Sequence, residues 1–109
     1  MMMGIVAAFL LATGLPPVHE AEPGLRAQAR VPYEAARKTA LAQVKHGAIK
    51  SAELEKEDGK LLYSFDLRRR GHSGIDEVHI DAATGAVLSV DHEGPAAEAT
   101  ERAQDRLHK

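Results

Sequence analysis

Residues 77–88 of the chain read EVHIDAATGAVL, and this stretch predicts a β-hairpin. Apolar and polar residues alternate up to Asp81 and again after Gly85, which is the period of half-buried strands. Between the two runs, the side chains of Asp81 and Thr84 suit hydrogen bonds to turn amides, and Gly85 suits a positive φ. The stretch therefore indicates two antiparallel strands whose apolar side chains share one face.

Two further strands are predicted before this hairpin. Alternating patterns at residues 52–55 and 61–68 flank Asp58 and Gly59, a dipeptide typical of a type I′ turn. A four-residue loop at 71–74 then leads into the hairpin. The pairs that these turns predict are Leu54–Tyr63, Ala52–Phe65, Leu67–Val78, Phe65–Ile80, Ile80–Leu88 and Val78–Val90, with Arg68–Glu77 and Asp66–His79 on the opposite face.

An amphipathic helix is predicted before the strands. Pro32 suits its first turn, Lys45 and His46 suit its last turn, and Gly47 suits the left-handed position that follows. The predicted fold class is α+β, with one N-terminal helix packed on a four-stranded antiparallel meander. Apolar side chains recur at spacings of three and four, at Tyr33, Ala36, Ala40, Leu41 and Val44.

Composition restricts the function classes. The chain has 109 residues, a formal net charge of −2 and no cysteine. Disulfides, cysteine-ligated metals and thiol catalysis are therefore excluded, and the charge is unlike that of a dedicated nucleic-acid binder. We expect one small domain that needs no cofactor.

The two ends of the chain differ from its middle. Residues 1–21 are interpreted as a signal peptide or hydrophobic N-terminal segment, because 1–15 are uncharged and shorter than the ~20 residues of a membrane-spanning helix. Cleavage after Ala21 or after Ala29 and an uncleaved membrane attachment are all left open. Residues 22–30 are interpreted as a linker, 31–91 as the folded domain and 92–109 as a polar, partly helical tail. We expect export to the periplasm or the medium.

From Pro32 to Val90 the chain resembles a PepSY domain. The resemblance rests on EAA at 34–36, on AELEKEDGK at 52–60, on LYSF at 62–65 and above all on the hairpin at 77–88. It implies a cystatin-like arrangement of one helix and four strands. It also implies an exported protein that binds and restrains peptidases, with no catalytic residues to transfer onto this chain.

The candidate sites are few, and each has a structural explanation. Glu77, His79 and Asp91 are weak metal candidates on one strand face, although cross-strand ion pairs explain the same residues better. Arg68 to Arg70 with Lys60 form a basic spot that we expect to keep an edge soluble. No nucleophile or phosphate-loop motif is present, so we expect no enzyme. The two functional hypotheses are a protein-binding domain, with a secreted peptidase as partner, and a periplasmic metal- or ligand-sensing module.

Overall fold

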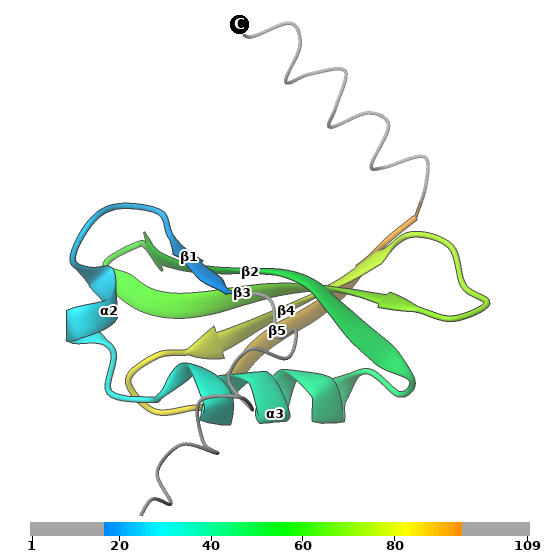
Figure 1. Cartoon of the computed structure of the whole chain (residues 1–109), viewed down its shortest axis with the longest axis horizontal. Helices are drawn as coiled ribbons and strands as arrows, with labels where there is room; N and C mark the ends of the chain where they lie inside the picture. The colour runs from blue at the N-terminus through cyan, green and yellow to red at the C-terminus, as the bar shows by residue number, and fades with distance from the viewer. Residues whose placement is uncertain (1–16, 95–109) are drawn as a thin grey trace, which may run out of the picture.

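The computed structural model of the chain describes residues 17–94, which form a sheet with helices on one side (Figure 1). The strand order is β1-β2-β3-β4-β5; β1 runs parallel to β2 and each later pair is antiparallel. The fold class is the predicted α+β. The elements are β1 (Val18–Glu20), α2 (Leu25–Gln28), α3 (Tyr33–Gln43), β2 (Gly47–Glu57), β3 (Lys60–Arg69), β4 (Ile75–Asp81) and β5 (Val87–Glu93).

Helix α3 supplies the cover for the sheet. Its small residues Ala36 and Ala40 are fully buried, which lets the helix axis approach the strands closely. Pro32 lies at the N-cap, where its carbonyl accepts the amides of Ala35 and Ala36. The core beneath the helix is formed mainly by Leu54, Phe65, Leu67, Val78 and Ile80.

The end of α3 differs from the prediction. The helix ends at Gln43, and the left-handed residue of the following turn is His46, with φ 61°, rather than Gly47. Gly47 is needed for a different reason. A Cβ there would lie 2.9 Å from Val44 Cγ1 and 3.1 Å from Leu67 Cδ2, so only glycine lets β2 start this close to the core.

The predicted β2–β3 hairpin is confirmed. Leu54 pairs with Tyr63 and Ala52 pairs with Phe65. Both residues of the tight turn have positive φ, 52° at Asp58 and 79° at Gly59, as a type I′ turn requires.

The predicted β3–β4 register is wrong by two residues. Phe65 lies opposite Val78 instead of Ile80, and the connection occupies residues 70–74. Arg68 lies near the end of β3, and its guanidinium donates to the Gly74 carbonyl of this loop at 3.0 Å. Because side chains alternate with a period of two, the shift leaves every residue on its predicted face.

The β4–β5 register is confirmed in one half and wrong in the other. Val78 pairs with Val90 as predicted, but Ile80 pairs with Val87 and not with Leu88. A β-bulge at this point inserts one extra residue into β5. The alternating pattern contains no signal for such an insertion.

The segment interpreted as a linker is structured. Leu25 of α2 is 2% exposed and belongs to the core, and the amides of Arg30 and Val31 both donate to the Ala82 carbonyl at 2.9 Å. Strand β1, which lies within the predicted N-terminal segment, occupies the edge beside β2. Residues 1–16 and 95–109, including most of the predicted signal segment and tail, lie outside the described residues.

A buried carboxylate ties three strands together at the far end of the sheet. Asp76 on β4 accepts from Arg69 Nε of β3 at 2.7 Å and contacts His92 Nδ1 of β5 at 2.9 Å. His92 and Glu93 therefore belong to a strand rather than to the predicted tail.

The aromatic cluster joins the helix to the sheet, and its hydroxyl can be tested. Tyr33 stacks on Phe65 with ring centroids 5.9 Å apart, and Tyr63 OH donates to the Val31 carbonyl at 2.7 Å. Burial raises the pKa of Tyr63, so its hydroxyl keeps the donated proton. We expect Tyr63→Phe to lower the free energy of unfolding by about 1 kcal/mol in urea titrations, because one partly buried acceptor loses its donor. An unchanged urea midpoint would show that this hydrogen bond does not stabilise the start of α3.

Candidate functional site

The β4–β5 turn is held by side-chain contacts within the hairpin. Asp81 Oδ1 accepts the amides of Ala83 at 2.7 Å and Thr84 at 3.1 Å, and Thr84 Oγ1 accepts the Ala86 amide at 3.2 Å. These amides, that of Ala83 first, hold the pKa of Asp81 below its usual range, with Lys60 contributing at 3.5 Å. Gly85 adopts φ 84°. The geometry gives these residues a structural role that directs β5.

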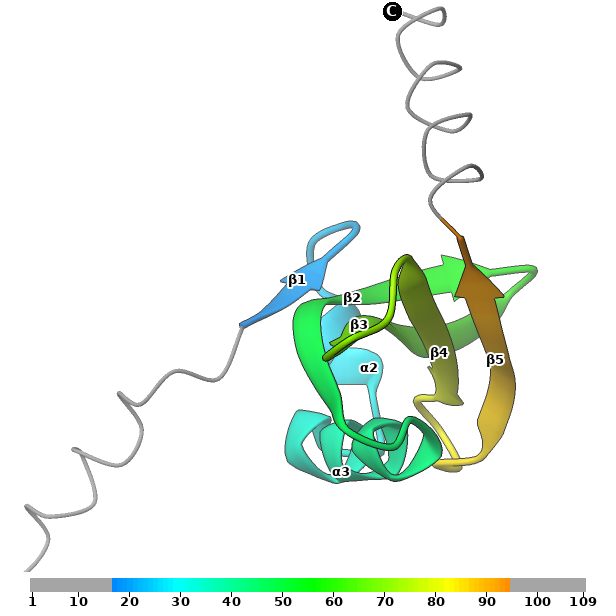
Figure 2. The same cartoon turned by 90° about the vertical axis from the view of Figure 1, so that its right-hand side faces the viewer.

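Strand β5 carries the exposed apolar surface of the molecule. Among residues 17–94 the exposed large apolar side chains are all on this strand: Val87 at 39%, Leu88 at 39% and Val90 at 45%. Val90 lies opposite the fully buried Val78, so it faces the helix side of the sheet. Helix α3 packs mainly against β4 and β3 and reaches β5 at only a few positions, so Val90 stays partly accessible (Figure 2).

The same strand forms an edge of the sheet. No strand in residues 17–94 pairs with the outer side of β5, whereas at the other side of the sheet the short strand β1 pairs with Ala52, Glu53 and Leu54 of β2. An unpaired edge presents alternate N–H and C=O groups to any extended polypeptide. We refer to the edge of β5 together with Val87, Leu88 and Val90 as the β5 surface.

A second feature is an acidic groove on the face of the sheet away from α3. The groove has a volume of about 410 Å³. It is bordered by several carboxylates and by His19, His79, Ser51 and Ser64. The corrected register brings Asp66 opposite Glu77 and Glu77 opposite Asp91, in place of the predicted Arg68–Glu77 and Asp66–His79 pairs. The carboxylates that line the groove are Glu53, Glu55, Glu57, Asp66 and Glu77.

The groove changes the acidity of one carboxyl group. Partial burial raises the pKa of Glu55 to about 7, helped by a side-chain hydrogen bond with Glu53 and by the charges of Glu53 and Glu57, while His79 opposes the shift. The groove therefore gains negative charge as the pH rises through neutrality.

The predicted metal candidates are only partly assembled. His79 Nε2 lies 3.5 Å from Glu77 Oε1, and Asp91 is the cross-strand neighbour of Glu77. Within the part of the chain that the structure describes, no three histidine or acidic side chains are grouped to hold a metal ion.

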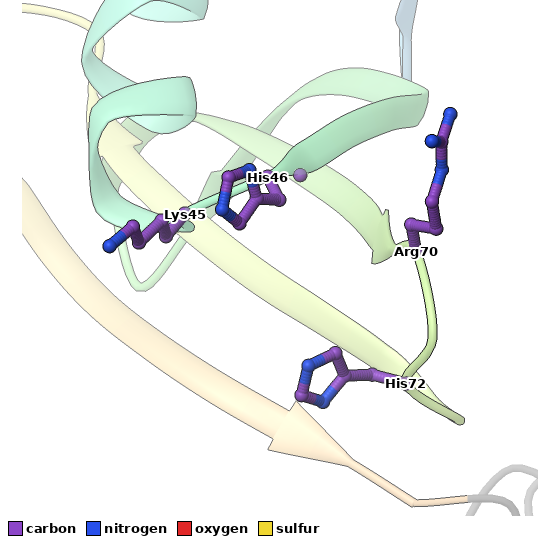
Figure 3. A pocket seen from close by; sticks show the side chains of 5 residues that line it. Lys45, His46, Arg70 and His72 are labelled. Carbon is purple, nitrogen blue, oxygen red and sulfur yellow. The ribbon is translucent and has the colours of Figure 1, made fainter.

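The predicted basic spot does not gather in one place. Lys60 and Arg69 lie at opposite ends of β3, and each is paired with a different aspartate, Asp81 and Asp76. Arg70 of the arginine run borders a hollow at the loop end of the sheet (Figure 3).

Sequence comparison assigns the family. The family model described as "Peptidase propeptide and YPEB domain", or PepSY, matches residues 30–91, which is more than half of the chain. The chain therefore belongs to the PepSY domain family, whose members are generally non-catalytic, propeptide-like modules of exported proteins. No curated protein and no solved structure matches the chain significantly.

None of the helices in residues 17–94 combines the length and the apolar character needed to cross a bilayer.

The sequence indicated the strand at 86–91 as one of two edges that could pair with a partner, but it did not indicate that the apolar side chains of this strand are exposed. The alternation of Leu88 and Val90 with polar residues predicts burial, but it does not reveal how far a helix reaches across a sheet. A usable signal is that one predicted helix has to cover four predicted strands.

The raised pKa of Glu55 has a consequence for stability. The ordinary pKa of a glutamate is 4.5, so the folded state binds this proton more tightly than the unfolded state does. The resulting stability is complete below pH 4.5 and is lost as the pH rises through about 7. We expect Glu55→Gln to remove this decline and to raise the free energy of unfolding at pH 8 by about 1 kcal/mol, a modest gain because solvent screens the groove.

Urea unfolding at pH 5 and pH 8 measures this effect. The matched control is Glu22→Gln, which removes an exposed carboxyl outside the groove. If both variants respond to pH like the wild type, the carboxylates of the groove do not repel one another as described.

Proposed function

We propose that this protein is an exported, non-catalytic binding domain that restrains or modulates a secreted or periplasmic peptidase. Membership of a family described by peptidase propeptides supports the class of partner. In this role the domain recognises the peptidase through its own surface.

The observation that carries this proposal is the β5 surface. Its three apolar side chains are 39–45% exposed, while Val78 and Ile80, which lie opposite Val90 and Val87, are fully buried. Apolar groups left next to a core, on an unpaired edge, are typical of surfaces that a partner covers.

Strand addition is the binding mode that fits this surface. An extended segment of the partner would pair with the backbone of β5, and the main-chain hydrogen bonds would supply affinity. Val87, Leu88 and Val90 would supply the apolar contacts on the helix side. Propeptide-like restraint needs no catalytic group in this domain, because binding alone holds the segment of the peptidase away from the position in which it acts.

The β5 surface can be tested by placing charge on it. We expect the wild-type chain to bind and slow a purified thermolysin-type metallopeptidase, and the double variant Leu88→Lys/Val90→Lys to weaken binding about 30-fold or more. The loss is expected because two central apolar contacts are replaced by charges that must be desolvated. Biolayer interferometry gives the affinity and a peptide-cleavage assay gives the inhibition.

The control uses the other side of the molecule. Ala48→Lys adds a lysine at an exposed position of β2, so it changes charge without touching β5. Equal affinity of wild type and Leu88→Lys/Val90→Lys would remove β5 from the interface. Absence of any binding by the wild type would contradict the proposed peptidase partner.

The sensor hypothesis is the second candidate and rests on fewer groups. Its support is the contact of His79 with Glu77 at 3.5 Å, beside a groove rich in carboxylates. Two ligands hold a divalent cation weakly, since zinc sites in proteins use three or four.

Calorimetric titration with Zn²⁺ separates the two hypotheses. The chain has six histidines, so some weak surface binding is expected from any variant. We expect the same weak heat from the wild type and from His79→Ala. A saturable one-site transition that is lost in His79→Ala and in Glu77→Gln would favour the sensor instead.

A further inference from the structure

The acidic groove has carboxyl groups at both of its ends. At one end, Glu53 and Glu55 lie on β2, where Glu55 is opposite Leu62 of β3. At the other end, Asp66 of β3 lies opposite Glu77 of β4. Leu62 and Asp66 are four residues apart in the sequence, which is about 13 Å along a strand. These four carboxyl groups border the same hollow, so its negative charge is divided between two places.

The two carboxyl groups at the β2 end are in contact with each other. A side-chain hydrogen bond joins Glu55 to Glu53, and both residues are half-buried. Two carboxyl groups this close repel each other when both are charged, so a positive species is needed between them. In the chain alone that species is a proton, because partial burial and the neighbouring carboxyl groups raise the pKa of Glu55 to about 7. A bound cation can take the place of this proton.

A buried hydroxyl group lies between the two ends. Ser64 of β3 is opposite Glu53 on one side and His79 on the other, and it borders the groove. It is only 9% exposed, yet its hydroxyl has no hydrogen-bond partner within residues 17–94. Every fully enclosed polar side-chain atom of those residues has a partner, so this hydroxyl opens onto the groove. Since buried polar groups normally bond to protein, water or a ligand, the Ser64 hydroxyl is available to a group that enters the groove.

Among the residues that the structure describes, none supplies a permanent cation to the groove. No lysine or arginine lines it, and its basic groups are the imidazoles of His19 and His79. Two basic side chains of β3 are on the same face of the sheet by strand alternation, but both are engaged elsewhere. Lys60 contacts Asp81 at 3.5 Å, and Arg68 donates to a backbone carbonyl of the next loop at 3.0 Å. The β2 end of the groove is thus left to a cation from outside the fold.

We infer that the acidic groove binds a free linear polyamine. One ammonium group binds between Glu53 and Glu55. Another, further along the ligand, binds at Asp66 and Glu77. An ammonium group donates up to three hydrogen bonds, so it can serve two carboxylates and the Ser64 hydroxyl together. The groove volume of about 410 Å³ is within the roughly 300–1,000 Å³ of small-molecule sites in proteins.

Two other occupants fit the groove less well. A metal ion would reach only one end, and no three histidine or acidic side chains of residues 17–94 are grouped to hold one. A polypeptide would gain no main-chain pairing, because the groove lies over the face of β2, β3 and β4 rather than along an edge. A small flexible amine needs neither arrangement. The groove is also on the opposite face of the sheet from Val90, so this inference does not depend on a peptidase partner.

Isothermal titration calorimetry of the full chain with spermidine at pH 8 tests the site. We expect saturable one-site binding that is at least tenfold tighter than that of butylamine, because butylamine carries a single ammonium group. In Glu53→Gln/Glu55→Gln the spermidine affinity is expected to fall at least tenfold, because the charge-assisted contacts at the β2 end are lost. The control Glu22→Gln/Glu34→Gln removes the same charge from exposed positions outside the groove and keeps the affinity.

Two single variants test the other parts of the site. Ser64→Ala is expected to weaken spermidine binding about threefold, because one acceptor of the groove is lost. Asp66→Asn is expected to weaken spermidine binding by a similar factor and to leave butylamine binding unchanged, because only the longer ligand reaches both ends. Circular dichroism and urea unfolding verify that each variant is folded.

Three results would overturn the site. One is equal affinity of the wild type for spermidine and butylamine. Another is equal loss of affinity in the two double variants, which would mean that only the overall charge matters. The third is tighter binding of the peptide acetyl-Ala-Lys-Ala-Lys-Ala-amide than of spermidine with the same dependence on the variants, which would make a polypeptide the occupant.

Discussion

The burial of one face of the sheet under a single helix is the constraint on which the rest of the structure depends. Eleven residues of α-helix span about 16 Å, and five strands spaced about 4.8 Å apart are wider than one helix diameter. The alanines of α3 allow close packing over Phe65 and its neighbours, which concentrates the core at the centre of the sheet. The helix reaches the edge strand β5 at only a few positions and leaves its apolar side chains partly exposed.

This constraint treats the two edges of the sheet differently. At the β2 edge, β1 pairs with β2 in parallel and α2 adds the buried Leu25. The segment before α3 therefore helps to cover this edge of the sheet. At the β5 edge nothing in residues 17–94 plays that part, and Val87, Leu88 and Val90 stay accessible. The asymmetry explains how a small domain can present one specific surface.

The hairpins were predictable from sequence because local chemistry determines them. Asp58-Gly59 and the Asp81 to Gly85 turn specify both the reversal and the side-chain faces. The β3–β4 register was not predictable to better than two residues, since a two-residue shift preserves every face. The three residues of β1 are too few to show the two-residue alternation of a strand. The bulge in β5 has no signal in the alternation of apolar and polar residues. Of the candidate sites, the turn residues follow from sequence, whereas the β5 surface depends on helix placement and the acidic groove depends on the true register.

An open apolar edge is a hazard for aggregation, and β5 limits that hazard along its own length. The bulge near Leu88 disrupts regular pairing at one end of the strand, and Asp91 and Glu93 place charge at the other. Asp76 holds His92 against the sheet, so this end does not separate from β4. Only a short stretch around Val90 then offers both free backbone groups and apolar side chains. A partner must match that stretch in length and must tolerate nearby carboxylates, which favours one extended segment over indiscriminate strand pairing.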